Sequence, residues 1–474
     1  MKRFQIKFKL FALTLLALIV LTPLFVSTKL YAQISDNASS SNIRLVADEF
    51  TPIPNWKGNF TAFNLHRAPI VGEPLFYGYD GYGSSGHNGI YLFNRGRLLK
   101  VADTNTQIPG IEEKENFGSF SLFNNKIASL GDGKVVFVGR DQSYREGLYL
   151  FDNGRLSVIA NKDTPMPGGT DTFSQFTNIT SIGGNDILFR GLNGTHHQQG
   201  IYAYKDGRIS LVVDKNTPIP GSGTLADFND FVVLNDELDL GIHIIKQTLP
   251  QKSGIYLFID GQYSLLVEDD SPIPDANYPK YFSDLKHLGG QNFMFRHVQQ
   301  FSDGEQEGLL GFIDGELVVI ANQNTLIPDG SGETLEDFTK HITTDIKQGN
   351  IAFTAGNEIY LYSVKYDTLE PISDGNFISA GRGTYPLILN NNIVFKAEVY
   401  YTGQNKEAFI SYSLRDGTYS VIADRDTPIP GYSGNFSFFR LEVMEINGNE
   451  FIFSGWSGVS PNTNSGVYRA VITK

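Results

Sequence analysis

The stretch Val46-Ala47-Asp48-Glu49-Phe50-Thr51-Pro52-Ile53-Pro54 decides the fold, because its pattern returns along the whole chain. Hydrophobic residues precede an acidic residue or Asn, and a loop with Thr or Ser and one or two prolines follows, except in a degenerate copy at Ile372-Ser373-Asp374 that lacks the prolines. With the residue aligned to Asp48 as the marker, the copies fall at positions 48, 103, 161, 214, 268, 322, 374 and 424, at intervals of 55, 58, 53, 54, 54, 52 and 50 residues. Repeats of this period are typical of propellers, solenoids and arrays.

Each interval contains four short apolar segments with no helical periodicity, which predicts four antiparallel strands. An aromatic pair such as Phe173-x-x-Phe176 leads into the first strand, and the apolar residues of the second strand end in a Phe. Asn-Gly and Asp-Gly pairs favour the positive φ angles of two-residue hairpins between the third and fourth strands. These pairs are Asn153-Gly154, Asp206-Gly207, Asp260-Gly261, Asp314-Gly315 and Asp416-Gly417. The sequence therefore predicts an all-β fold, an eight-bladed β-propeller of four-stranded antiparallel blades.

Counting the strands predicts how the ring closes. The last repeat, Phe436 to Ile472, contains only three strands, and one unpaired fourth-strand segment, 42–48, lies at the N-terminus. We expect this segment to complete blade eight and to cover an edge that would otherwise promote aggregation. The predicted organisation is a signal peptide at 1–32, a short linker at 33–41 and a single propeller domain at 42–474.

The N-terminal segment has the layout of a secretory signal peptide, with basic residues before the apolar run Leu10 to Val26 and small Ala32 at a cleavage position. An uncleaved membrane anchor is the alternative, but Pro23 within the run favours cleavage. We expect a secreted protein, extracellular or periplasmic, without a membrane span in its mature form and monomeric.

Charge and cysteine content exclude several classes of function. Five of the 38 basic residues and none of the 51 acidic residues precede residue 33. The chain from residue 33 onward therefore has 33 basic and 51 acidic residues, a formal charge of −18. A surface this acidic repels phosphate backbones, so no nucleic-acid partner is expected. The chain has no cysteine, which excludes disulfides, thiolate metal sites and a cysteine nucleophile.

The repeated phrases resemble a bacterial extracellular tandem-repeat family with the signatures Asn-x-x-Gly-x-x-Ala-Phe and Val-Ala-Asp-x-x-Thr-Pro-x-Pro-Gly. The second-strand phrases that carry the likeness are Asn185 to Gly191, Asn350 to Ala355 and Asn391 to Ala397. The resemblance covers nearly the whole mature chain and implies export and a repeat architecture. It implies no agreed activity, and this sequence departs from the family in showing no visible surface anchor.

The hairpins between second and third strands are the predicted working surface, because function tends to lie in variable loops on a rigid scaffold. They should share one rim with the proline loops, since strand direction alternates within a blade. Arginine suits anionic groups and aromatic rings suit sugar faces, so a carboxylated or sulfated glycan is the expected partner. The candidate ligand-binding residues are Tyr82, Arg140, Arg145, His196, His197, Arg296, His297 and Trp456. Ordinary polar hairpin residues are the alternative interpretation.

The order His66, His87, Tyr144 and Arg190 is similar to the His, His, Tyr and Arg set of propeller-type ulvan lyases. That resemblance implies a polysaccharide lyase acting by β-elimination on a uronate. Arg190 would neutralise the carboxylate, Tyr144 or His87 would remove the proton, and His66 would protonate the leaving oxygen. The chain departs from those enzymes, which have seven blades and a different spacing from Tyr to Arg.

No cofactor is evident from the sequence, although calcium or zinc is a possible metal. The marker residues Asp48, Asp103 and Asp214 are candidate calcium contacts, but they lack the spacing of a calcium loop, and a structural role in the turn is favoured. Adjacent His196 and His197 point apart in an extended loop, so one metal cannot easily take both. The leading function is a secreted glycan-binding propeller, with a polysaccharide lyase and a structural surface protein as the alternatives.

Overall fold

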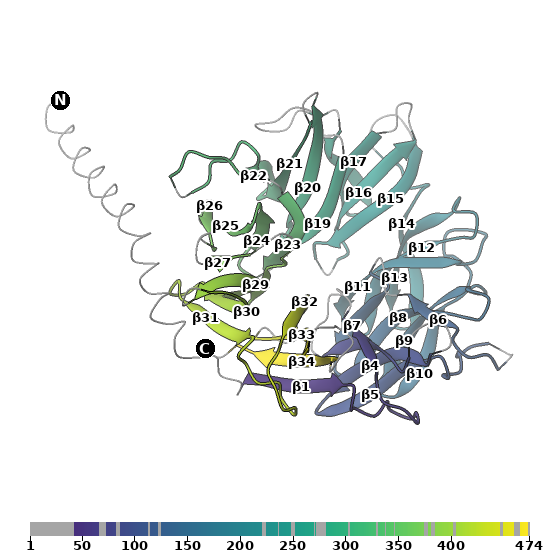
Figure 1. Ribbon diagram of the computed structural model, residues 1–474. Helices are drawn as coiled ribbons and strands as arrows, with labels where there is room; N and C mark the ends of the chain where they lie inside the picture. Colours follow the sequence, from purple (N-terminus) through teal and green to yellow (C-terminus); the bar gives the residue numbers. More distant parts are fainter. Residues whose placement is uncertain are drawn as a thin grey trace, which may run out of the picture.

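The computed structural model confirms an all-β, eight-bladed β-propeller (Figure 1). It describes residues 42–65, 73–81, 86–111, 114–121, 125–219, 224–235, 237–247, 252–269, 271, 281–301, 304–328, 330–336, 338–345, 347–373, 378–380, 384–401, 404–445, 449–458 and 465–472. The expected signal peptide and linker lie outside these residues, as do His66, Tyr82 and the marker Asp374. No helix in the described part of the chain is long and apolar enough to cross a membrane.

The first four blades take the chain from Ala62 to Glu268. Blade one consists of β2 (Ala62–Asn64), β3 (Leu75–Tyr79), β4 (Asn88–Asn94) and β5 (Arg97–Asp103). Blade two consists of β6 (Ser119–Ser121), β7 (Ile127–Gly131), β8 (Lys134–Arg140), β9 (Glu146–Asp152) and β10 (Arg155–Ala160). Blade three consists of β11 (Gln175–Gly183), β12 (Asp186–Leu192), β13 (Gln199–Lys205) and β14 (Arg208–Asp214). Blade four consists of β15 (Thr224–Val233), β16 (Leu240–Gln247), β17 (Lys252–Ile259) and β18 (Gln262–Glu268).

The other four blades complete the ring. Blade five consists of β19 (Tyr281–Gly289), β20 (Asn292–Phe301), β21 (Gly304–Ile313) and β22 (Glu316–Asn322). Blade six consists of β23 (Phe338–Asp345), β24 (Asn350–Ala355), β25 (Glu358–Ser363) and β26 (Thr368–Pro371). Blade seven consists of β27 (Ile378–Ser379), β28 (Leu387–Leu389), β29 (Asn392–Tyr401), β30 (Gln404–Ser413) and β31 (Tyr419–Asp424). Blade eight consists of β32 (Phe438–Glu445), β33 (Glu450–Trp456), β34 (Ser465–Val471) and β1 (Ile43–Asp48).

Blades two and seven differ from the plain four-stranded pattern, because their first strand is interrupted. In blade two, β6 and β7 both pair with β8, and in blade seven, β27 and β28 both pair with β29. In blades three, four, five, six and eight the first strand contains a register shift instead, as between Thr177 and Thr180. A β-bulge of this kind bends the strand locally while keeping it in the sheet.

A repeated contact of Phe, Gly and Tyr explains the aromatic motif in blades one, two, three and eight. Phe173 is buried and packs edge-on against Tyr202, with ring centroids 4.9 Å apart. A Cβ atom on Gly191 of the second strand would lie 2.4 Å from the Phe173 ring, so only glycine fits there. The same contact occurs at Gly78 with Phe60, at Gly139 with Phe117 and at Gly455 with Phe436.

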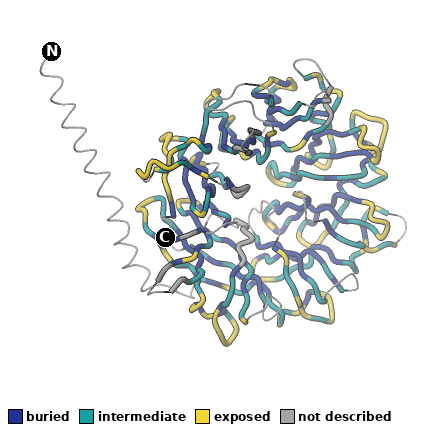
Figure 2. The backbone as a smooth tube through the Cα atoms, turned by 45° about the horizontal axis from the view of Figure 1, so that its top comes forward, coloured by how far each residue is buried: buried dark blue, intermediate teal, exposed yellow. Residues whose placement is uncertain are grey.

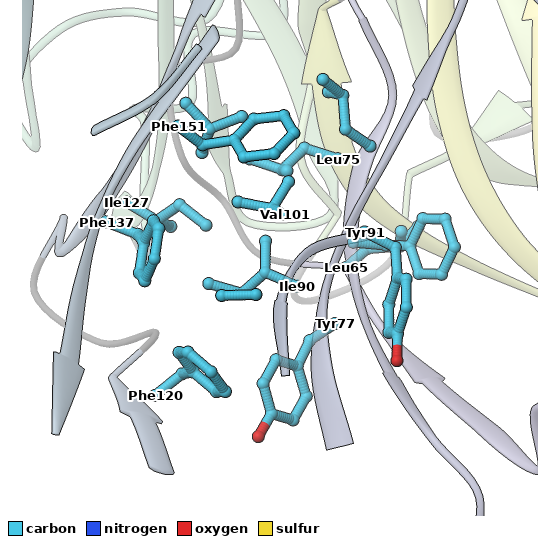
Figure 3. Close-up of a cluster of buried hydrophobic side chains, with 14 of the residues drawn as sticks. Leu65, Leu75, Tyr77, Ile90, Tyr91, Val101, Phe120, Ile127, Phe137 and Phe151 are labelled. Atoms are coloured by element: carbon cyan, nitrogen blue, oxygen red, sulfur yellow. The ribbon is translucent and has the colours of Figure 1, made fainter. Parts of the chain in front are cut away.

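The hydrophobic core lies between neighbouring blades rather than at the centre of the ring. Figure 3 shows Ile90 and Val101 of blade one in the space facing Phe137 and Phe151 of blade two. Comparable clusters join the other neighbours, for example Val138 with Phe176 between blades two and three. Figure 2 shows buried backbone through the body of the blades and exposed backbone at the peripheral turns.

The proline loops are held by their own marker residue. The Asp48 Oδ1 atom accepts hydrogen bonds from Phe50 N at 3.0 Å and from the Thr51 hydroxyl at 2.7 Å, and Thr51 Oγ1 accepts from Asp48 N. Asp103, Asn161, Asp214, Asn322 and Asp424 each make the same bonds in their loops. Side chains that bond their own backbone two residues on stabilise turns. The carboxylates named as candidate calcium contacts are therefore used within the turn.

The two-residue hairpins follow the expected chemistry with one exception. Asn153, Asp206, Asp260 and Asp314 have φ angles of 46° to 52°, and the glycine after each is also positive. The expectation was wrong at Asp416-Gly417, where only Gly417 has a positive φ, of 66°. There Ser413 N donates to the Thr418 carbonyl at 2.9 Å, so four residues, 414–417, form the loop.

The predicted ring closure is confirmed. Strand β1 pairs antiparallel with β34, with Ile43 opposite Ala470 and Asp48 opposite Gly466. Glu49 extends the contact, because its Oε1 atom accepts from both the backbone N and the hydroxyl of Ser465 at 3.1 Å. Figure 1 shows β1 and β34, the first and last strands of the chain, lying side by side in blade eight.

Removing β1 tests this closure. A chain that begins after Asp48 should unfold with at least ~3 kcal/mol less free energy, since buried Ile43 and Val46 each contribute roughly 1.5–3 kcal/mol. It should also self-associate through the uncovered edge of β34. Urea unfolding and light scattering measure both effects, with a chain that begins at Asn42 as the control. Equal stability of the two chains would show that closure does not depend on β1.

Candidate functional site

The proline loops and the hairpins between second and third strands contact one another on one face, here called the proline-loop rim. In blade one the indole N–H of Trp56 donates to Asp80. In blade two Gln142 N donates to the Glu115 carboxylate at 2.9 Å, and in blade three Asn193 Nδ2 donates to Asp171 at 2.6 Å. The prediction that both sets of loops share one rim is confirmed by these contacts.

A pocket of about 510 Å³ opens on this rim between blades two and three. Its lining residues come from the blade-two hairpin, the following proline loop and the start of blade three: Arg140, Tyr144, Arg145, Glu146, Lys162, Thr172, Phe173, Ser174, Gln175 and Gly194. Tyr144 is 74% exposed, the most exposed large hydrophobic side chain in the described part of the protein. An aromatic ring left in water beside a polar pocket is available for stacking on a ligand.

The blade-two hairpin is organised by Asp141, which positions Tyr144. Asp141 Oδ1 accepts from Ser143 N at 2.8 Å and from Arg145 N at 2.9 Å, and its Oδ2 accepts from Arg145 Nε at 2.5 Å. This turn places Tyr144 in the left-handed region, with φ of 62°. The tyrosine is thus presented by a hydrogen-bonded turn.

Beneath the pocket, one carboxylate forms ion pairs with two cations. The Oε1 atom of buried Glu146 accepts from Lys126 Nζ at 2.6 Å and from Arg140 Nη2 at 2.7 Å. Its Oε2 atom accepts from Phe176 N of blade three at 3.2 Å. The group therefore has one positive charge more than its carboxylate balances. Arg140 uses Nε and Nη2 on Glu146, and its one-third-exposed side chain lines the pocket.

His87 lies elsewhere on the rim, enclosed by its neighbours. Its ring stacks on Trp56 with centroids 4.1 Å apart, its Nε2 atom is 3.1 Å from Asp103 Oδ2, and its Nδ1 atom is 2.9 Å from Asn105 Nδ2. Burial lowers the pKa of His87, although the Asp103 charge opposes that shift. His87 is not among the residues that line the pocket between blades two and three.

Arg190 and Arg296 lie within strands and not in hairpins as expected. Arg190, in β12, donates to Asp227 of blade four and to Gln199 at 2.8 Å, and burial lowers its pKa. Arg296, in β20, pairs with Glu307 and is 3% exposed. Both directly follow the Phe of a second strand, Phe189 and Phe295. Side chains at that position point between blades, where a cation must be paired with an anion. The repeated Phe-Arg pair marks this position in the sequence.

The other predicted ligand residues are dispersed. His196 and His197 are exposed in the blade-three hairpin, whose Gly194 lines the pocket. His297 is buried in blade five, and Trp456 stacks on Phe438 in blade eight at 5.7 Å. Within the described ranges, no cluster of three or more His, Asp or Glu side chains could hold a metal ion.

The structure adds two cations that the sequence reasoning missed, Lys162 in the pocket lining and Lys126 beside Glu146. Lys162 lines the pocket because it directly follows the marker Asn161, on the loop that shares the rim with the hairpin. Its position relative to the marker could have identified it. Lys126, which bonds Glu146, precedes β7 and gives no such signal.

The buried and exposed candidates should differ in stability effect. Arg190→Ala removes the ion pair with Asp227 and the hydrogen bond to Gln199, so we expect a loss of roughly 2–4 kcal/mol. Tyr144→Ala should change the free energy of unfolding by less than about 0.5 kcal/mol. Urea unfolding of both variants measures this difference. A neutral Arg190→Ala would mean that the guanidinium is free for a ligand.

Two buried histidines predict a loss of stability in acid. Burial lowers the pKa of His243 and of His297 from 6.5 to about 4. The unfolded chain takes up these protons near pH 6.5 and the folded chain only near pH 4. Stability is therefore full above pH 6.5 and falls toward pH 4, by about 1.4 kcal/mol per pH unit for each histidine.

Comparing His243→Gln with the wild-type protein isolates one histidine, because carboxylates titrate in both. The variant should lose less stability between pH 7 and pH 4.5, by about 2 kcal/mol, in urea unfolding. Exposed His197→Gln is the control and should follow the wild-type curve. Parallel curves for all three proteins would contradict the assignment.

Comparisons with known proteins add a partial family match. Residues 26–238 match the model of a family of unknown function, DUF7453. No curated protein matches the chain. The resemblance to the extracellular tandem-repeat family stays a prediction.

Several solved structures are distantly similar. An oligogalacturonate lyase from Vibrio parahaemolyticus shares 10% identity, with 85% of this chain and 99% of that chain covered and a TM-score of 0.42. The polysaccharide lyase Uly1 shares 11% identity over 78% and 94% of the two chains, with a TM-score of 0.41. The BP39L lectin from Burkholderia pseudomallei shares 9% over 77% and 99%, with a TM-score of 0.36. Likenesses this distant carry no argument about the activity of this chain.

Proposed function

We propose that this propeller is a glycan-binding protein and that the pocket between blades two and three is its binding site. The observation that supports this function is the combination of exposed Tyr144 with Arg140, Arg145 and Lys162 around one open pocket. Sugar rings stack on aromatic faces, and their hydroxyl and carboxylate groups accept from guanidinium and ammonium donors. The surplus positive charge beside Glu146 favours an acidic glycan.

The proposed setting is outside the cytoplasm. Residues 1–32 have the charge, apolar run and small-residue site of a secretory signal peptide. Polysaccharides of cell walls and extracellular matrices are encountered there. An exported protein without cysteine is also insensitive to the redox state of its surroundings.

The alternative function, β-elimination from a uronate, needs an acid, a base and a cation around one sugar residue. The pocket contains Tyr144 with Arg140 and Arg145, but its lining includes neither His87 nor Arg190. His87 is enclosed by Trp56 and Asp103, and Arg190 is paired with Asp227. Binding therefore has more support than the four-residue lyase set.

Tyr144→Ala tests the binding function. We expect acidic polysaccharides to bind at least tenfold more weakly, because a lost stacking contact costs about 1–2 kcal/mol. Isothermal titration against polygalacturonate, alginate and ulvan, with soluble starch as the neutral comparison, measures this change. Tyr366→Ala is the matched control, since Tyr366 is 68% exposed but lies at the turn between β25 and β26.

Three outcomes would count against the proposal. Unchanged affinity in Tyr144→Ala would move the site away from this pocket. Absence of binding to every polysaccharide would contradict glycan recognition. Growth of the ultraviolet absorbance of unsaturated uronates during incubation would identify the protein as a lyase.

A further inference from the structure

The charged group beneath the pocket has a second copy between blades seven and eight. Glu407 occupies in blade seven the strand position that Glu146 occupies in blade two. Glu146 precedes Gly147, which pairs with Gly139, and Glu407 precedes Ala408, which pairs with Ala397. The two carboxylates are therefore equivalent by register.

The hydrogen bonds of the two carboxylates match as well. Glu407 accepts from the backbone N of Phe439 at 3.4 Å, as Glu146 accepts from Phe176. It also forms ion pairs with two cations, Lys396 Nζ at 2.8 Å and Arg425 Nη2 at 3.5 Å. This group, like the first, has one cation more than its carboxylate balances.

The surrounding cations also correspond. Arg425 directly follows the marker Asp424, as Lys162 follows Asn161, and Lys406 precedes Glu407 as Arg145 precedes Glu146. At the other described interfaces the position of Glu146 holds Asn88, Gln199, Ser253, Glu307 and Ser465, and the position of Lys162 holds Thr104, Lys215, Asp269, Gln323 and Glu49. Among these interfaces, only those of blades two and seven combine a carboxylate with a cation after the marker.

Aromatic rings accompany the second copy. The Arg425 guanidinium lies 5.3 Å from the centroid of the Phe438 ring, and Phe438 stacks on Trp456 at 5.7 Å with an interplanar angle of 22°. On the same loop as Arg425, partly exposed Tyr432 stacks on Phe50 at 6.0 Å. The side chain of Arg425 is about half exposed.

We propose that Glu407, Arg425, Tyr432, Phe438 and Trp456, here called the blade-eight patch, form a second binding site for carboxylate-bearing sugar residues. The surplus cation supplies the charge for a uronate, and the aromatic rings supply the stacking surface. This inference rests on the proposed function for its ligand chemistry, but on separate residues. Both sites lie on the proline-loop rim, so one polyuronate chain long enough to reach both binds bivalently.

Titration calorimetry with tetragalacturonate, a short carboxylated probe, counts the sites. Wild-type protein should bind two molecules per chain, Tyr144→Ala one, Arg425→Gln one, and the double variant none. Arg425→Gln leaves Lys396 paired with Glu407, so the fold should be retained, and its melting curve checks this. Maltotetraose, of the same length and uncharged, should bind to none of them.

Polygalacturonate tests the bivalent contact. Loss of either site should weaken its binding by about 100-fold or more, which exceeds the loss expected of one independent site. The control is the double variant Lys365→Gln with Tyr366→Ala, a cation over an aromatic ring at 4.9 Å between β25 and β26, and it should bind like wild type.

The outcomes separate the two proposals. One tetragalacturonate per wild-type chain, lost in Tyr144→Ala and kept in Arg425→Gln, would overturn the blade-eight patch and leave the proposed pocket intact. One tetragalacturonate per wild-type chain that is lost only in Arg425→Gln would support the blade-eight patch and overturn the proposed pocket. No binding of tetragalacturonate or polygalacturonate by wild type would overturn both.

Discussion

The pairing of β1 with β34 is the constraint on which the ring depends. Each blade buries its apolar faces against two neighbours, so a row of eight blades is satisfied only when the last one meets the first. The pairing joins chain segments more than 400 residues apart, and Glu49 to Ser465 extends it by a side chain. Once the circle is closed, the repeated strand order gives equivalent sequence positions similar surroundings, as at Gly139, Gly191 and Gly455.

That shared geometry decides which polar residues are structural. The residue after the second-strand Phe points between blades, and at this position Arg190 pairs with Asp227 and Arg296 pairs with Glu307. A buried cation without a partner is strongly unfavourable, so such residues are bound to a carboxylate and are unavailable to a ligand. A surplus of positive charge arises where two cations share one carboxylate, as Lys126 and Arg140 share Glu146.

Most of the fold could be predicted from the repeat period, the turn residues and the strand count, because these signals are local and recur in eight copies. Closure of the ring could be predicted by counting the strands of the repeats. The candidate site was less accessible, since partners such as Arg190 and Asp227 are 37 residues apart and lie in different blades. The second strand continues past its Phe, as β12 and β20 do, and Arg190 and Arg296 were misplaced because the hairpin was expected to begin directly after that Phe. Tyr144 was placed correctly because Asp141 forms its turn within the hairpin itself.

A propeller of repeated blades acquires binding sites by changes at a few equivalent positions. The backbone N–H of the second Phe in the next blade donates to a Glu on the third strand, as at Glu146 and Glu407. Each Glu pairs with a cation of the second strand, Arg140 or Lys396, and with one further cation. A single acidic substitution can therefore organise a cationic cluster at the rim without altering the packing of Phe, Gly and Tyr below it. Repetition of the frame makes the same chemistry attainable more than once on one face, which is the arrangement that a ligand of repeating units can use.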